Sequence, residues 1–355
     1  MAKINLLVLF GGVSTEHEVS RVSAASVLSR LDPEKYNIIP VGITKAGQWF
    51  LYGGCDSDAV SEGRWETAEE NLPAILSPSR GDGLLVFGKG KVAKIPVDCV
   101  FPVLHGLNGE DGTLQGLFEA AGVAYVGSGV GASSNCMDKS VTKILAGQYN
   151  ILQADYILVH KSEFAKAPDD AVTAAEEKFK YPVFVKPSSS GSSVGVSKAK
   201  DREGLKSALD EAFRYDKKVL IEEAVDGQEI EVAVLGNDEP IASVPGEIVP
   251  SREFYSYEAK YIDNSSGLII PAGIPEEASD SARKEALTVY RALGCRGLAR
   301  VDFFVRRADF AVVLNEINTI PGFTSISMYP KLFEASGIKY PELLDRLIAL
   351  AMSDK

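Results

Sequence analysis

Polar side chains that could handle phosphate and a divalent cation stand in two apolar segments near the end of the chain. Arg300 and Asp302 alternate with apolar residues in one segment, and Glu316 and Asn318 do so in the other. Successive strand residues point to opposite faces, so each pair shares one face of its strand. Two adjacent strands would thus present two carboxylates and an amide beside a guanidinium. Oxygen donors of this kind suit Mg²⁺ that bridges substrate phosphates. A solvated amphipathic sheet face is the alternative.

A second group of polar residues follows the apolar residues 182–185. Lys186 and Pro187 lead into the Ser/Gly-rich residues 188–193. A lysine followed by a small, flexible loop can fold backbone amides over phosphates, as other glycine-rich loops do. A surface loop without a ligand is the alternative. Together with the predicted metal site, the loop indicates a nucleoside triphosphate site, and we expect the loop to be mobile without ligand.

One competing pattern suggests a serine hydrolase. Residues 191–195, GSSVG, satisfy the G-x-S-x-G motif, which needs a helix after the serine and a histidine later in the chain. Residues 194–197 are predicted to be a strand, and all three histidines (His17, His105 and His160) precede Ser193. The order of residues therefore excludes this class.

Two nucleotide-binding motifs also fit only in part. Residues 83–90 resemble a Walker loop, but Gly90 replaces the Ser or Thr that holds magnesium, and a hairpin is the better prediction. Residues 127–132, GSGVGA, lack the acidic residue of a dinucleotide-binding unit. Three histidines and four cysteines, scattered without metal-ligand spacing, argue against a zinc site.

Composition limits the partners and the compartment. The 355 residues carry a net charge of −12, which repels nucleic acid and anionic membranes. The four cysteines follow no disulfide framework, which predicts unpaired, buried thiols. The apolar residues 4–10 are too short for a membrane span and lack a signal-peptide cleavage site. We expect a cytoplasmic protein with a small-molecule substrate.

The elements that must position these residues form three blocks, which we place at residues 1–128, 129–226 and 227–355. In the first block, strands at 4–10 and 99–104 alternate with helices near 19–31 and at 113–121. This alternation predicts a parallel sheet covered by helices. Residues 53–94 are left unassigned.

The other two blocks mix strands and helices. The second contains helices at 139–148 and 201–213 and strands at 182–185, 194–197 and 219–222. The third contains strands at 229–235, 298–305 and 310–315 and helices at 276–293 and 342–351. The fold class is therefore α/β, with three domains.

The combination of motifs resembles the ATP-grasp superfamily, and within it the D-alanine–D-alanine ligase family over nearly the whole chain. The motifs are GGVSTEHEVS (11–20), HGLNGEDG (105–112), MDK (137–139), KPSSSGSSVG (186–195), YEAKY (257–261) and NEINTIPGFTS (315–325). The resemblance implies an N-terminal α/β domain, and central and C-terminal α+β domains that sandwich ATP.

The resemblance also implies a nucleotide site. Its residues match Lys139, Lys186, Ser193, Glu222, Glu223, Val225, Glu229, Lys260, Asn315 and Glu316. Lys139, Lys186 and Lys260 match phosphate contacts, and Glu229 matches a ribose acceptor. Residues 222–225 match the hinge that receives adenine. Asp302, Glu316 and Asn318 match the family's ligands for Mg²⁺ or Mn²⁺, with two ions expected.

The implied substrate site lies at the other end. Glu16 matches the anchor for the ammonium of the first D-alanine, with His105 nearby. Ser192 and Tyr261 match partners of Glu16, and Arg300 and the Gly322 amide match oxyanion donors. Ser327 and Met328 match residues that line the second D-alanine, although both Tyr261 and Met328 could instead be packing residues. The site residues expected around the amino acids are therefore Glu16, His105, Ser192, Tyr261, Arg300, Gly322, Ser327 and Met328.

The implied activity is ATP-dependent ligation of two D-alanines through a D-alanyl phosphate, which supplies peptidoglycan precursors. A homodimer is also implied. Ile326 stands at a position that varies in the family, so acceptor selectivity stays open between D-alanine and the alternatives D-serine and D-lactate. A non-catalytic nucleotide-binding regulator is the second alternative, although binding alone would not require Arg300.

Overall fold

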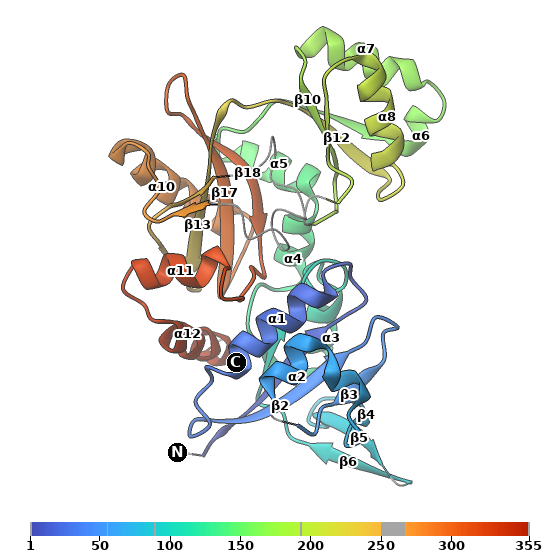
Figure 1. Ribbon diagram of the computed structural model, residues 1–355, viewed down its shortest axis with the longest axis vertical. Helices are drawn as coiled ribbons and strands as arrows, with labels where there is room; N and C mark the ends of the chain where they lie inside the picture. Colours follow the sequence, from blue (N-terminus) through green and yellow to red (C-terminus); the bar gives the residue numbers. More distant parts are fainter. Residues whose placement is uncertain (1, 55, 89, 192–193, 250–266, 354–355) are drawn as a thin grey trace.

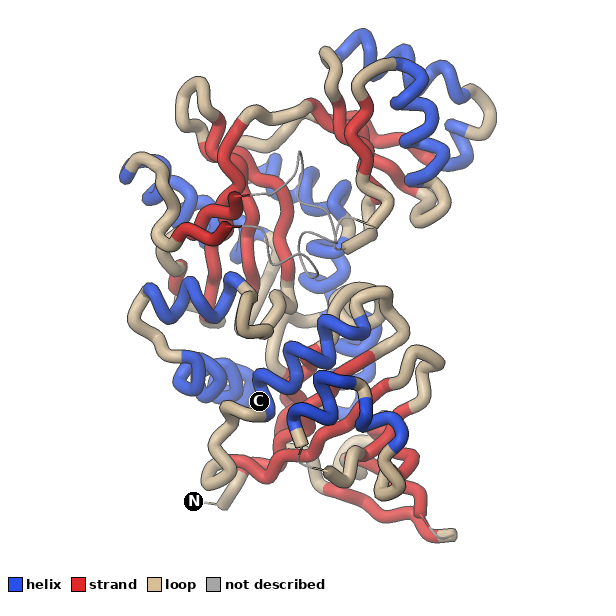
Figure 2. The backbone as a smooth tube through the Cα atoms, in the orientation of Figure 1, coloured by secondary structure: helices blue, strands red, loops and turns tan. Residues whose placement is uncertain are grey.

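The computed structural model describes residues 2–54, 56–88, 90–191, 194–249 and 267–353. Four of the predicted site residues, Ser192, Ser193, Lys260 and Tyr261, lie outside these ranges. The strands form three separate sheets, with helices packed against each (Figure 1). Figure 2 shows the three groups of strands, one in each part of the elongated molecule.

The N-terminal sheet has eight strands in the order β6-β5-β4-β3-β2-β1-β7-β8. Its parallel half contains β1 (Ile4–Gly11), β2 (Tyr36–Ile43), β7 (Cys99–Val103) and β8 (Ala124–Tyr125). The predicted parallel sheet is thus correct for this half only. An antiparallel half completes the sheet. It consists of β3 (Trp49–Leu51), which precedes the unassigned segment, and of β4 (Leu72–Leu76), β5 (Leu84–Gly88) and β6 (Lys91–Ile95), which lie largely within it.

Two helices of the N-terminal part lie where the spacing of apolar residues predicts them. α1 (His17–Leu28) and α3 (Thr113–Ala121) lie where amphipathic spacing predicts them, and β5 and β6 form the predicted hairpin. α2 (Ser57–Glu62) and the 3-10 helix η1 (Arg64–Thr67) occupy the unassigned segment. Trp65 of η1 is fully buried against Phe10, which explains why this polar segment packs onto the sheet.

The central sheet is antiparallel, in the order β11-β10-β12-β9. Its strands are β9 (Tyr156–His160), β10 (Val183–Pro187), β11 (Ser197–Ala199) and β12 (Lys218–Glu223). α6 (Lys161–Phe164), α7 (Pro168–Lys178) and α8 (Arg202–Ala212) complete this part. The predicted strand at 194–197 is wrong in position, since the strand starts only at Ser197; Gly195 before it has φ +74° and turns the chain.

The C-terminal sheet runs β16-β15-β13-β17-β18, and β14 pairs with β13. The strands are β13 (Gly227–Leu235), β14 (Ile241–Ala242), β15 (Gly246–Val249), β16 (Gly267–Ile269), β17 (Leu298–Arg306) and β18 (Val312–Asn318). α10 (Glu276–Ala292), α4 (Val130–Met137) and α5 (Lys139–Gln148) pack on it and share one apolar core with its strands. The helix that carries Lys139 is therefore held beside β18.

The chain ends by returning to the N-terminal sheet. α11 (Met328–Ala335) contributes Leu332, and α12 (Tyr340–Ser353) contributes Leu343 and Leu347, to a core that also contains Phe101 and Val103 of β7. In Figure 1 the C-terminus lies beside α1. This docking connects the segment after β18 to the loops after β1 and β7.

Two predictions from composition can be compared with the structure. Cys99, Cys136 and Cys295 are buried thiols, as predicted, while Cys55 lies outside the described residues. Across the ranges that the structure describes, no helix has the length and apolarity needed to cross a bilayer.

Candidate active site

Strands β17 and β18 bring the predicted metal ligands together. Asp302 lies directly opposite Glu316, and Arg300 directly opposite Asn318. The register shifts between Asp302 and Phe303, which leaves Asn315 as an extra residue in β18. Such a bulge redirects side chains. Asn315 consequently contacts Lys186 while its neighbour Glu316 contacts Lys139, although strict alternation would have pointed them to opposite faces.

Asp302 is the more deeply buried of the two predicted acidic metal ligands, with 2% of its surface exposed. Arg300 donates to both of its oxygens at 2.7 Å, and Asn318 donates at 3.1 Å. The Arg300 Nε also lies 3.0 Å from Glu231, a buried acid on β13 that faces Asp302 across the sheet. The guanidinium is thereby held in a fixed orientation by two carboxylates.

The donor set fits a divalent ion with a preference for oxygen. Asp302, Glu316 and Asn318 offer two carboxylates and one amide oxygen at adjacent positions, and Lys139 and Arg300 already supply positive charge there. Among the described residues, no group of three or more His, Cys, Asp or Glu is arranged around a metal position, so an amide and phosphate oxygens would have to complete the shell. The residues are compatible with Mg²⁺ or Mn²⁺ bound together with a nucleotide.

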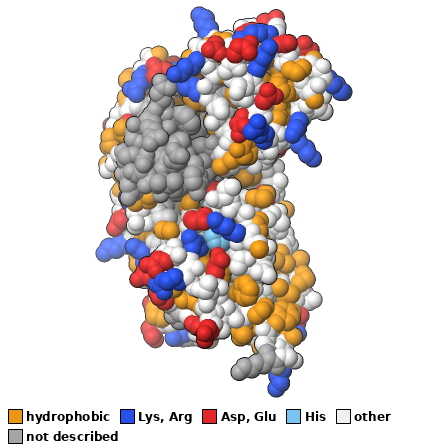
Figure 3. Space-filling view, turned by 45° about the vertical axis from the view of Figure 1, so that its right-hand side comes forward, with side chains coloured by type: hydrophobic (Ala, Val, Ile, Leu, Met, Phe, Trp, Pro, Cys, Tyr) orange, Lys and Arg blue, Asp and Glu red, His pale blue; other side chains and the backbone are white. Residues whose placement is uncertain are grey.

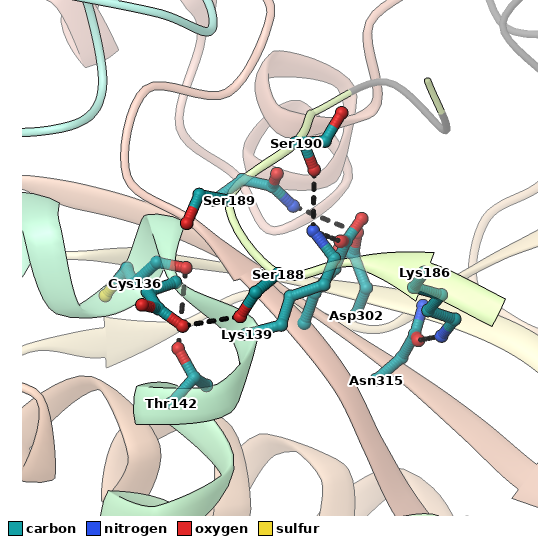
Figure 4. A network of polar contacts seen from close by, with 12 residues as sticks. Cys136, Lys139, Thr142, Lys186, Ser188, Ser189, Ser190, Asp302 and Asn315 are labelled. Atoms are coloured by element: carbon teal, nitrogen blue, oxygen red, sulfur yellow. Dashed lines mark hydrogen bonds and ion pairs between the residues drawn. The ribbon is translucent and has the colours of Figure 1, made fainter. Parts of the chain in front are cut away.

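Lys186 lies on β10 and points toward β18 (Figure 4). Its ammonium is 2.7 Å from Glu222 Oε2 and 3.1 Å from Asn315 Oδ1. Burial alone would lower the pKa of Lys186, but Glu222 outweighs it and the pKa is raised, so the lysine stays charged. Glu222 also binds Lys143 at 3.1 Å, so one buried carboxylate holds two lysines.

The predicted hinge follows β12. The side chain of Glu222 faces the two lysines, which leaves its backbone for any contact with a base. Glu223 is exposed, and its carboxylate accepts from the Asp155 amide at 3.0 Å. Val225 is half-buried in the connection to β13, and Glu229 on β13 lies close enough to raise the pKa of Lys186.

Lys139 begins α5 and lies at the same end of β18. Its ammonium donates to the Ser190 carbonyl at 2.8 Å and lies 3.2 Å from Glu316 Oε2. Figure 4 shows Lys139 extending past Ser188 toward Ser190. Lys139, Lys186 and Glu316 are thus gathered around the start of the Ser/Gly loop, as the resemblance implies.

The first residue of that loop is buried and hydrogen-bonded at the start of α5, while the mobility expected of the loop stays a prediction. Ser188 is fully buried, and its hydroxyl donates to Asp138 Oδ1 at 2.6 Å. Asp138 is the N-cap of α5, accepts from Ser140 and pairs with Lys218. Burial alone would raise the pKa of Asp138. The contacts with Lys218, Ser140 and Ser188 outweigh this effect and lower the pKa to about 2.

Replacing Asp138 should therefore loosen the loop as well as the helix. In Asp138→Ala, we expect the loss of the cap to cost about 1 kcal/mol of unfolding free energy and amide exchange at Ser188–Ser190 to accelerate. Because the folded-state pKa is depressed, this contribution is complete above about pH 4 and is lost as the pH falls toward 2. Hydrogen exchange and thermal unfolding would measure both effects.

Asp201→Ala is the matched control, since Asp201 caps α8 through Gly204 and makes no hydrogen bond to the described part of the Ser/Gly loop, residues 188–191. It should lower stability to a similar extent and leave exchange at Ser188–Ser190 unchanged. Equal acceleration in both variants would show that Asp138 acts only through global stability.

Glu16 lies at the opposite end of the site, at the start of α1, with 6% of its surface exposed. A Cβ at Gly106 would lie 2.5 Å from Glu16 Oε2, and a Cβ at Gly191 would lie 3.0 Å from it. The carboxylate thus fits between the loop after β7 and the Ser/Gly loop only because both neighbours are glycines. Glu16 therefore lies next to both of these loops.

His105 is buried and neutral at physiological pH. Its Nδ1 lies 3.0 Å from the Ile320 carbonyl, so Nδ1 carries the proton, and Nε2 accepts from the Ser23 hydroxyl at 3.2 Å. Burial, and to a smaller extent Arg300, lower the pKa of His105 to about 4, although the hydrogen bond to the Ile320 carbonyl opposes the shift. The ring therefore connects the N-terminal part to the segment after β18 and is not a cation.

The residues expected around the second amino acid follow β18. Gly322 leaves room for the Ser327 hydroxyl, since a Cβ there would be 2.7 Å from Oγ. The Ser327 hydroxyl accepts from the Thr324 amide, and the residue stands at the N-cap position of α11 without a capping hydrogen bond from its side chain. Met328 is 4% exposed and packs into the core against Gly246, which favours packing over lining a substrate pocket.

Sequence reasoning missed four charged residues that the structure places in this network: Asp138, Lys143, Glu231 and Glu110. Glu231 shares the alternation of Glu229 on β13, a signal that could have found it. Lys143 follows Lys139 by one helical turn, which places both on one face of α5. Asp138 and Glu110 stand within quoted motifs but were given no role.

Family comparisons cover nearly all of the chain. The family described as "D-ala D-ala ligase N-terminus" matches residues 5–128, and that described as "D-ala D-ala ligase C-terminus" matches residues 145–349. A D-alanine–D-alanine ligase from Caldicellulosiruptor bescii is 56% identical over 99% of this chain and 96% of its own length. Another from Clostridium acetobutylicum is 52% identical over 99% of this chain and 98% of its own.

Solved structures of ligases also resemble this chain. The VanG D-Ala:D-Ser ligase from Enterococcus faecalis is 39% identical and superposes with a TM-score of 0.89 over 99% of this chain and 100% of that one. The D-alanine–D-alanine ligase from Coxiella burnetii is 35% identical, with a TM-score of 0.86 over 100% of this chain and 95% of that one. The predicted three-part α/β fold is confirmed. The chain belongs to the D-alanine–D-alanine ligase family.

Proposed function

We propose that this chain joins two D-alanine molecules into D-alanyl-D-alanine at the expense of ATP, and that β18 organises the reaction. The main support for this proposal is a series of contacts made by β18 and by the residues that directly follow it. Asn315 and Glu316 contact the two phosphate-side lysines, Asn318 contacts Asp302, and Ile320 contacts His105. A nucleotide end and an amino-acid end are thereby joined by one short segment.

In the first step, a carboxylate oxygen of the first D-alanine attacks the γ-phosphorus of ATP, and the bond to the β-phosphate oxygen breaks to release ADP. Lys139 and Lys186 hold the phosphates in line, since phosphoryl transfer needs mainly positioning and charge neutralisation. A divalent ion held by Asp302, Glu316 and Asn318 would supply further neutralisation of phosphate charge. Glu16 holds the ammonium of the same D-alanine.

In the second step, the amine of the second D-alanine loses its proton and attacks the acyl carbon. The C–O bond to phosphate then breaks, and inorganic phosphate leaves. Arg300 is fixed by Asp302 and Glu231, so it can donate to the developing oxyanion with little reorganisation. Ser192, Ser193, Lys260 and Tyr261, whose roles rest on the resemblance, would close the site against water.

The activity is tested by ADP release with four additions: no amino acid, D-alanine, D-alanine with D-serine, and D-alanine with D-lactate. We expect release that depends on D-alanine, with D-alanyl-D-alanine as the main product in mass spectrometry. Nucleotide binding without ADP release would favour a regulator, and a mixed product in preference to the dipeptide would overturn D-alanine as acceptor.

A homodimer and a cytoplasmic location are also part of this proposal, as are two metal ions. Exposed apolar side chains support the homodimer: Ile75, Phe87 and Val92 lie on one face of β4, β5 and β6 and are 38–56% exposed. Figure 3 shows hydrophobic side chains gathered in the lower part of that view, where the outer strands of the N-terminal sheet lie. A pairing of two copies through these strands would cover them.

A further inference from the structure

Lys143 is a buried lysine for which the family resemblance implies no role. It lies on α5, one helical turn after Lys139, and only 3% of its surface is exposed. Its ammonium is 3.1 Å from Glu222 Oε1, donates to the Ala154 carbonyl at 3.2 Å and lies 5.1 Å from the centre of the Tyr156 ring. A side chain so enclosed offers little surface to a ligand, so any effect on a nucleotide must pass through its neighbours.

The backbone beside Lys143 is attached to both sheets that flank the nucleotide site. The side chain of Gln153 donates to the Lys143 carbonyl at 2.8 Å, and the preceding Leu152 carbonyl accepts from the Leu314 amide of β18 at 2.8 Å. On the other side, the ammonium faces Glu222 of β12 in the central sheet. Lys143 therefore has a defined position between the C-terminal sheet and the hinge that follows β12.

Glu222 is shared between two lysines that differ in accessibility. Its Oε2 lies 2.7 Å from the Lys186 ammonium, and its Oε1 faces Lys143. The Lys186 side chain is 13% exposed and that of Lys143 is 3% exposed, so Lys186 is the one that can meet a ligand. Burial alone would raise the pKa of Glu222, but the two lysines outweigh it and the pKa is lowered, so the carboxylate is ionised. The cluster thus has one positive charge in excess.

The shared carboxylate interacts more strongly with Lys186 than with Lys143. Burial lowers the pKa of Lys143, Glu222 opposes this shift only in part, and Lys186 adds to it. For Lys186 the effect of Glu222 exceeds that of burial, and the pKa is raised. The contact of Glu222 with Lys186 is also the shorter of the two. Without Lys143, Glu222 and Lys186 would therefore form a neutral ion pair.

We propose that Lys143 is a positioning residue of the nucleotide site, whose ammonium compensates Glu222 so that Lys186 keeps a full positive charge for the phosphates of ATP. This inference rests on the proposed function and extends it, because the resemblance implies only Lys139, Lys186 and Lys260 as phosphate contacts. A neutral ion pair attracts an anion weakly, whereas a second cation beside it leaves a positive charge in excess. Solvent screens such a buried charge less than a charge at the surface.

Lys143→Met tests this role, because it removes the charge and keeps an unbranched side chain of similar length. We expect the KM for ATP to rise roughly tenfold, as residues in one ion-pair network are coupled, and the KM for D-alanine to stay unchanged. Calorimetric titration with a non-hydrolysable ATP analogue and Mg²⁺ should show the same loss of affinity in the absence of turnover.

The double variant Lys143→Met/Glu222→Gln separates an effect of charge from an effect of packing. It removes the carboxylate together with the cation that compensates it, so Lys186 again carries an excess positive charge. We expect the KM for ATP and the affinity for the analogue to return most of the way to wild type. If Lys143 only supports the packing of α5, the second substitution should add to the loss. If Lys143→Met fails to fold, the double variant decides alone, because the proposal requires it to bind the analogue nearly as well as wild type.

Thr142→Val is the matched control on the same helix. Thr142 is buried, and its hydroxyl donates to the Asn135 carbonyl at 2.8 Å, so the variant weakens the attachment of α5 without changing a charge. It should lower the Tm and leave the KM for ATP unchanged. A rise in this KM equal to that in Lys143→Met would overturn the proposal, because loss of support for the helix would then explain both variants.

This inference and the proposed function fail in different ways. Unchanged affinity for the ATP analogue in Lys143→Met, with D-alanine-dependent ADP release by wild type, would overturn the role of Lys143 and leave the ligase assignment intact. An equal rise of both KM values in Lys143→Met would do the same, since an effect on the phosphates should not reach D-alanine. Weakened analogue binding in Lys143→Met, with no ADP release by wild type, would refute the ligase and retain the role of Lys143 at the nucleotide.

Discussion

Glu316→Gln should reduce turnover by about a hundredfold or more and leave the fold intact. Glu316 lies directly opposite Asp302 and 3.2 Å from the ammonium of Lys139, so one negative charge disappears from the centre of the site. The substitution keeps the volume and most hydrogen bonding of the side chain. Steady-state ADP release would measure the loss, and Mn²⁺ binding in the presence of an ATP analogue would show whether it comes from metal affinity.

Glu334→Gln is the control, because Glu334 is an exposed acid on α11. It should retain activity and Mn²⁺ binding. Near-normal activity of Glu316→Gln at ordinary magnesium would refute the assignment of Glu316 as a ligand. Reduced activity with unchanged Mn²⁺ affinity would instead assign Glu316 to the orientation of Lys139.

Lys186→Ala should weaken the use of ATP by about tenfold to a hundredfold and barely affect D-alanine. Hydrogen bonds to charged groups contribute about 1.5–3 kcal/mol, and this variant loses those that Lys186 would make to phosphate. It also leaves Glu222 with Lys143 as its remaining lysine partner, so a buried carboxylate beside the proposed nucleotide site loses one of its two compensating charges. Measuring KM for each substrate separately tests this.

Lys217→Ala removes an exposed lysine directly before β12 and should leave both KM values unchanged. The placement of the nucleotide would be wrong if Lys186→Ala raised the KM for D-alanine while that for ATP stayed constant. Lys186→Arg adds a further comparison. It retains the charge but not the compact geometry, and we expect it to recover only part of the activity.

Much of this site could be predicted from local patterns. Period-two alternation placed Asp302, Glu316 and Asn318 on strand faces, and the two strands do pair with those residues adjacent. Helical spacing predicted α1, α3 and α5, because an amphipathic helix needs only its own residues to define the buried face. The motifs identified the family, which the comparisons confirm.

Other features depend on contacts between distant segments. The segment at 53–94 contains the short strands β4, β5 and β6, which form the antiparallel half of the N-terminal sheet together with β3. Strands this short show no clear alternation of apolar and polar residues, so the sequence alone does not predict them. The bulge at Asn315 depends on the register between β17 and β18. The sequence predicts that Ser188 belongs to a flexible loop. In the structure its hydroxyl donates a hydrogen bond to Asp138, which lies 50 residues earlier in the chain.

The sequence by itself determined which residue types are available for the chemistry and which strands and helices carry them, because these follow from side-chain periodicity along the backbone. Only the tertiary structure decided their charge states and partners. Lys143 and Lys186 share Glu222, His105 is buried and neutral, and Arg300 is shared between two acids. Proton affinity depends on burial and on nearby charges, and those are set when segments far apart in the chain pack together.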